Sequence, residues 1–71
     1  MKPQNAAVLA LLRAHPEGVT QLQALYAVGT FRLGARVWDL RHDGYHVETE
    51  WQMTDKGQRI ARYRLHEEVA A

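Results

Sequence analysis

The chain has 71 residues, of which 46% are hydrophobic and 24% are charged, and its formal net charge is only +1. This length corresponds to a single domain with a modest core, and the lack of cysteine excludes disulfides and thiolate metal sites. The longest apolar run, residues 6–12, is too short to cross a bilayer. Because the first residues also lack a secretory apolar run, we expect a cytoplasmic protein with no membrane partner.

The first predicted helix spans residues 4–15. Its alanine-rich sequence favours helix, and its larger apolar residues recur at helical spacing. Pro16 stops this helix, and Gly18 opens a turn. Val19 follows as the start of a strand of one or two residues.

The second predicted helix begins after Thr20. Thr20 and Gln23 have the spacing of a capping box, in which each side chain bonds to the main chain of the other residue. Gly29 ends the helix, since glycine readily takes a positive φ. Thr30 is a candidate N-cap for the next helix, so two helices are expected to meet across a very tight turn.

The third predicted helix runs from Phe31 to His42 and ends at Gly44. Leu33, Val37 and Leu40 form one apolar stripe along it. The opposite arc carries aromatic, acidic and basic residues. We therefore expect one buried face and one face that is free to contact a partner.

A β-hairpin is predicted after Gly44, because the apolar period changes there from 3.6 to two. One strand starts at Tyr45, the turn lies at residues 54–57, and the second strand starts at Arg59. A single register matches both the apolar rows and the opposite charges. It places Val47 opposite Leu65, Thr49 opposite Tyr63 and Trp51 opposite Ala61 on the inner face, with Glu48 opposite Arg64 and Glu50 opposite Arg62 outside.

Together these elements predict an α+β fold, a winged helix-turn-helix in which three helices precede a two-stranded hairpin wing. We expect one domain over residues 1–66 and a frayed tail over residues 67–71. Phe31 and Trp38 are expected to be partly buried beneath the wing, with an exposed interaction patch as the alternative. The expected core is Val8, Leu11, Leu12, Leu22, Leu25, Leu33, Val37, Leu40, Val47, Tyr63 and Leu65, with Trp51 on the inner face of the sheet.

Several segments of the chain also resemble a known family. They are residues 20–25 (TQLQAL), Gly29, residues 31–41 (FRLGARVWDLR), residues 44–50 (GYHVETE) and residues 59–65 (RIARYRL). Together they resemble small helix-turn-helix proteins that are frequent in phages and prophages of bacteria. The resemblance extends from Val8 to Leu65 and implies a winged-helix fold and DNA binding.

The architecture itself supports binding of double-stranded DNA. A helix buried on one stripe can present its other face to the major groove, and residues 56–64 carry four basic residues and no acid. We expect the start of the third helix to enter the groove, the hairpin tip to contact backbone or minor groove, and the start of the second helix to contact a phosphate. The residues expected closest to DNA are Gln21, Thr30, Arg32, Ala35, Arg36, Lys56 and Arg59.

The low net charge leaves other interpretations open. A domain with so few basic residues should bind DNA weakly as a monomer, so tight binding would need a homodimer or a partner protein. The alternative function is a protein-interaction module that docks onto a host or phage protein and modulates it. A salt series separates the two, because phosphate binding weakens steeply with salt.

Three further expectations concern side-chain chemistry. His42 and His46 are four residues apart, but Gly44 between them breaks the helix that a metal site would need, so no metal site is expected. No nucleophile stands at a recognisable spacing from a base, so neither an enzyme nor a cofactor is expected. Arg41 is expected to bond to the sheet or to the last carbonyls of a helix, and Arg62 and Arg64 are expected to pair with the glutamates across the hairpin.

Overall fold

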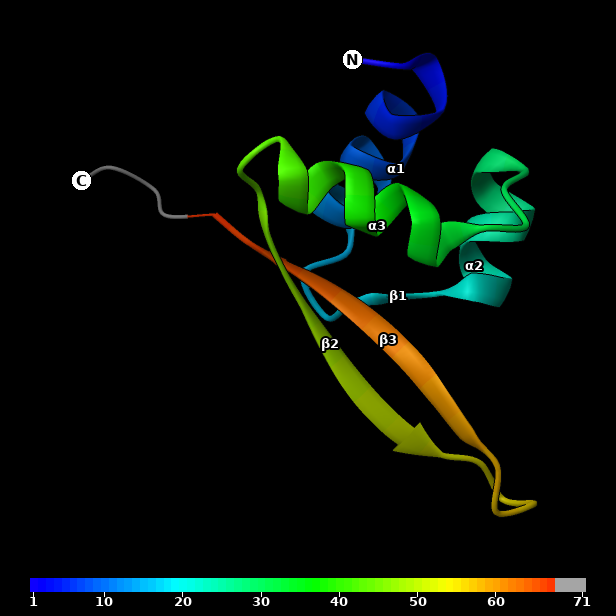
Figure 1. Ribbon diagram of the computed structural model, residues 1–71. Coiled ribbons are helices and arrows are strands. Elements are labelled where there is room, and N and C mark those ends of the chain that lie inside the picture. The colour runs from blue at the N-terminus through cyan, green and yellow to red at the C-terminus, as the bar shows by residue number, and fades with distance from the viewer. Residues whose placement is uncertain (68–71) are drawn as a thin grey trace.

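The computed structural model describes residues 1–67. Three helices and three strands follow one another along the chain, and the strands form an antiparallel sheet of order β1-β3-β2. In Figure 1, α3 crosses in front of α1, and the β2–β3 hairpin projects away from the helices. The architecture is thus α+β with a hairpin after three helices, as predicted. The elements are α1 Pro3–Ala14, β1 Val19–Thr20, α2 Gln21–Val28, α3 Leu33–His42, β2 His46–Met53 and β3 Arg59–His66.

The ends of α2 confirm the prediction from the sequence. Thr20 Oγ1 accepts a hydrogen bond from Gln23 N at 3.3 Å, and Thr20 N donates to Gln23 Oε1 at 2.9 Å. This capping box satisfies two main-chain donors at the start of the helix. Gly29 ends α2 with a φ of +74°, in the left-handed region that a residue with a side chain rarely adopts.

The start of α3 differs from the prediction. The helix begins at Leu33 rather than Phe31, and its N-cap is Arg32 rather than Thr30. The Thr30 hydroxyl accepts from Arg32 N at 3.2 Å and so holds the turn instead of capping the helix. The first main-chain donor of α3, Leu33 N, bonds to the side-chain oxygen of Gln21 at 2.8 Å.

The core lies between the three helices and the half of the sheet next to them. This near half contains Val47, Tyr63 and Leu65, and the far half, toward the hairpin turn, contains Trp51 and Ala61. Leu9, Val19 and Ala24 belong to it although the sequence analysis did not include them, and Leu22 is 61% exposed although it was expected there. Residues two apart on a helix point about 200° apart, so burial of Ala24 directs Leu22 outward. The buried apolar side chains are Val8, Leu9, Leu12, Val19, Ala24, Leu33, Val37, Leu40 and Val47, with Leu11, Val28, Tyr45, Tyr63 and Leu65 packed against them.

The predicted hairpin register is confirmed at all five pairs. The inner face is nevertheless covered for only part of its length. Val47 is 3% exposed, but Trp51, expected to fill the same face, is 60% exposed. The far half of the hairpin extends past the helices (Figure 1), so no element of the described chain packs over Trp51.

The short strand β1 joins the helices to the sheet. Val19 and Thr20 lie opposite Tyr63 and Arg62 of β3, which makes β3 the central strand. Gly18, just before β1, is buried with a φ of +108°. Any side chain there would meet the aliphatic part of Arg62, so the loop passes directly beneath β3.

Candidate nucleic-acid interface

The outward face of α3 carries the first group of predicted DNA contacts. Arg32 is exposed, while Ala35 and Arg36 are half-buried. A guanidinium nitrogen of Arg36 lies 3.1 Å from Gln4 Oε1 and another lies 3.4 Å from Asp39 Oδ2. The Asp39 carboxylate on this face is therefore neutralised by a neighbouring cation, which reduces its repulsion of phosphate.

Two of the predicted contacts belong instead to the internal framework of the helix pair. Thr30 is 2% exposed, so its hydroxyl is not available on the surface. The Gln21 amide donates to Thr30 O at 2.7 Å and accepts from Leu33 N, which ties the start of α2 to the start of α3. These bonds satisfy main-chain groups at the turn, and they fix the position of Arg32 on the surface.

The second group lies at the far end of the hairpin. Lys56 and Arg59 are both exposed. The guanidinium of Arg59 stacks over the Trp51 ring at 4.7 Å from its centroid, a favourable cation–π contact. The wing therefore presents two cations, one of them held against an aromatic ring, with Asp55 in the turn between the strands.

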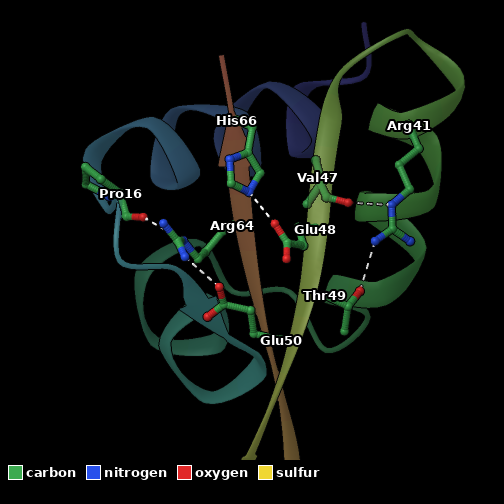
Figure 2. A network of polar contacts seen from close by, with 8 residues as sticks. All are labelled: Pro16, Arg41, Val47, Glu48, Thr49, Glu50, Arg64 and His66. Atoms are coloured by element: carbon green, nitrogen blue, oxygen red, sulfur yellow. Dashed lines mark hydrogen bonds and ion pairs between the residues drawn. The ribbon is translucent and has the colours of Figure 1, made fainter. Parts of the chain in front are cut away.

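Arg41 of α3 and Arg64 of β3 have protein partners, as Figure 2 shows. Arg41 donates to Val47 O and to Thr49 Oγ1, both at 2.9 Å, and so supports β2 as expected. Arg64 donates to Glu50 Oε1 at 2.6 Å and to Pro16 O at 3.3 Å. The hydrogen bond that Arg64 donates to Glu50 raises the pKa of Arg64 above its ordinary value.

The cross-strand charges pair diagonally rather than directly. Glu50 lies opposite Arg62 in the register but bonds to Arg64, and Glu48 lies opposite Arg64 but bonds to His66 at 2.6 Å. Diagonal neighbours come within reach of long side chains on a twisted hairpin. Arg62 is left to reach the main-chain oxygen of Glu17 at 3.5 Å. The predicted pairing with a glutamate across the hairpin is therefore confirmed for Arg64, through Glu50, and is wrong for Arg62.

The aromatic residues beside the interface are exposed, contrary to the expectation of partial burial. Phe31 is 79% exposed because it lies in the turn before α3 and not on the apolar stripe. Trp38 also points outward and stacks on His42 at 3.6 Å between ring centroids. This arc of α3 is therefore more apolar and less basic than a typical DNA-reading face.

An apolar groove of about 590 Å³ separates the start of α3 from the far half of the hairpin. The sequence analysis did not predict it. Leu22 and Phe31 are exposed side chains of this groove. From the sequence alone neither could be placed there, because the opposite wall is formed by residues of the hairpin that are distant along the chain. The groove is lined by Thr20, Gln21, Leu22, Leu25, Phe31, Gly34, Thr54, Ile60, Ala61 and Tyr63.

Two short helices joined by a tight turn, followed by a hairpin that flanks the second of them, are the parts of a winged helix-turn-helix. Residues 3–68 match the winged helix-turn-helix domain family. The chain belongs to this family. A search of curated proteins finds no match, and a search of solved structures finds none either.

Two further observations concern other kinds of site. Within residues 1–67, no group of three histidine, aspartate or glutamate side chains is placed to hold a metal ion. In the same part of the chain, no helix combines the length and apolar character needed to cross a membrane.

Proposed function

We propose that this winged helix-turn-helix domain binds double-stranded DNA through the start of α3 and the tip of the hairpin. The observation that carries the proposal is the distribution of unpaired cations. In the described residues, Arg32, Lys56 and Arg59 are exposed and their side chains have neither an ion pair nor a hydrogen bond, and Lys2, just before α1, is the one other cation in this state. The arginines at the opposite end of the domain and along the sheet bond to protein groups instead.

The two regions would make different contacts. A helix buried on one stripe is narrow enough to enter the major groove, where Arg32 and Ala35 would lie nearest the base edges. Arg36 could reach the same groove by exchanging Gln4 for a DNA acceptor. Lys56 and Arg59 would contact phosphates beside it, which positions the domain without reading sequence.

The low net charge limits the strength of this binding. With a formal charge of +1, non-specific attraction to DNA is small, so we propose that two copies act together on one site. The resemblance to phage and prophage proteins suggests a transcriptional regulator or a recombination accessory factor, working in the cytoplasm at the nucleoid.

The test is titration of a random-sequence duplex at low and at high salt. Lys56→Ala is expected to weaken binding and to flatten the dependence on salt by about one unit of slope. Arg13→Ala is the matched control, since it also removes one exposed cation but from a residue bound to Glu67 on the far side of the domain. Equal effects of the two substitutions, or binding that ignores salt, would contradict the proposal.

A protein-docking function on the same fold is the second candidate. The apolar groove favours it, because a phosphate backbone offers nothing to fill an apolar surface of this size. The duplex titration separates the candidates, because a domain that acts only by docking onto a protein would show no salt-dependent binding to DNA.

A further inference from the structure

The central strand β3 is paired along only part of one edge. On that edge β1 contributes just two residues, opposite Tyr63 and Arg62, whereas β3 runs for eight residues. The chain then turns into α2, so no strand of the described chain lies beside residues 59–61 on this side. Main-chain groups along such an edge are a template for another strand.

The apolar groove opens at this position. Ile60 and Ala61 of the free edge line one wall, and Leu22 and Leu25 of α2 line the other. Phe31 closes the end next to α3. No charged side chain lines the groove, so its occupant must supply apolar groups.

Cations flank this groove at both ends. Arg32 follows Phe31 beside α3, and Lys56 and Arg59 lie at the hairpin end, with Asp55 the single acid of that turn. An occupant with acidic residues on either side of an apolar centre would match this distribution.

We propose that the groove binds an extended, apolar segment of a partner protein, flanked by acidic residues, which adds to β3 as a strand in continuation of β1. Alternate side chains of this segment would enter the groove between Leu22 and Phe31, and its main chain would bond to the free edge at residues 59–61. This interaction goes beyond DNA binding and does not depend on it.

Strand addition is favoured over a docked helix by the geometry of the site. A helix satisfies its own main-chain groups and would leave the β3 edge unpaired. A strand would fill the groove with its side chains and, at the same time, pair its main chain with the β3 edge. The exposure of Leu22 and Phe31 is then explained, because both would be covered in the complex.

The experiment begins with selection of short random peptides displayed on phage against the intact chain. Enriched peptides are expected to alternate apolar residues between acidic ends. A synthetic copy of one such peptide should shift the amide resonances of residues 59–61 and of Leu22. N-methylation of the alternate main-chain nitrogens that face β3 should weaken binding of the peptide by about tenfold or more, while methylation of the other alternate set should not, since only the first set donates to the edge.

Leu22→Glu should abolish binding of that peptide, and Tyr26→Glu is the matched control. Both side chains are exposed on α2, Tyr26 by 83%, but only Leu22 lines the groove. Neither substitution removes a buried group, so thermal melts should show both variants folded. The melts separate loss of the site from loss of the fold.

Four results would overturn the proposal. One is that the intact chain enriches no peptides beyond those that the Leu22→Glu variant enriches. Another is that both alternate sets of N-methyl groups weaken binding equally, which would indicate a helix in the groove, since a helix needs all of its main-chain donors. Shifts of residues 59–61 that grow with protein concentration alone would assign the groove to a second copy of the chain. Shifts of the same residues with duplex DNA and not with peptide would assign it to DNA.

Discussion

The near and far halves of the hairpin share one alternating pattern but differ in what covers them. Val47 and Trp51 lie on the same face of β2, yet the first is buried under α3 and the second is exposed. The alternation of apolar and polar residues therefore indicates which face of a strand is apolar. Whether a residue on that face is buried depends on whether a helix packs over it. The near half contributes to stability, and the far half is left available for contacts with other molecules.

The largest effect expected in the near region follows Leu40→Ala. Leu40 of α3 is fully buried in the core, so its truncation should lower the free energy of unfolding by about 2–5 kcal/mol. Urea denaturation measures this loss, and Trp51→Ala in the far half is the control, with an expected loss of less than about 1 kcal/mol. Similar losses for the two variants would remove the distinction between the halves.

Gln21→Ala is expected to have the next largest effect. The substitution leaves Thr30 O and Leu33 N without their partner at the turn between α2 and α3, and an unsatisfied group of this kind costs about 1–3 kcal/mol. Gln23→Ala is the comparison, because Gln23 bonds only to the exposed start of α2. Hydrogen exchange at Leu33 should rise in the first variant and stay unchanged in the second.

Arg59→Gln tests the far half directly and should change stability little. Its contact with Trp51 is exposed, and cation–π pairs at exposed sites contribute about 0.5–1 kcal/mol. The ring resonances of Trp51 should shift, while those of Trp38, which stacks on His42, should not. An unchanged Trp51 spectrum would show that the two side chains do not stack in solution.

The smallest expected effect is a loss of stability in acid. A hydrogen bond from Arg13 lowers the pKa of Glu67. The pKa of Glu17 is lowered chiefly by a hydrogen bond from its own main-chain N–H and next by one from His15. Both carboxylates bind protons more weakly in the folded chain, so they stabilise it above their unfolded pKa. This stabilisation is lost as pH falls through the folded pKa values. Carboxyl resonances followed by NMR should titrate below the ordinary glutamate range, and Arg13→Gln should restore that of Glu67 alone.

The parts of the fold that local chemistry determines were predictable. The capping box of Thr20 and Gln23, the stop at Gly29 and the hairpin register depend on neighbours along the chain or on paired periodicity, and all of them are confirmed. The short strand at Val19 was also expected. The frayed tail over residues 67–71 stays a prediction, because residues 68–71 lie outside the described residues. Glu67, the first residue of that tail, bonds to Arg13 at 2.8 Å.

The features that depend on distant parts of the chain were not predictable. The Gln21 side chain bonds to a helix that begins twelve residues later, and nothing in its own helix indicates this. Exposure of Leu22 and Trp51 depends on how α2 packs and how far the hairpin projects. For the candidate interface, the sequence identified exposed cations at Arg32, Lys56 and Arg59, but it could not show that Thr30 is buried.

The close passage of Gly18 beneath β3 has a consequence for how relatives of this chain can vary. A methyl group at this position would lie 2.5 Å from Cγ of Arg62 and 2.9 Å from Cγ of Arg64. Smaller residues at positions 62 and 64 would remove the collision but not the strain of a φ of +108°. Among homologues, position 18 should therefore stay glycine even where both arginines are replaced. The side chains at positions 62 and 64 should vary in length without any change at position 18.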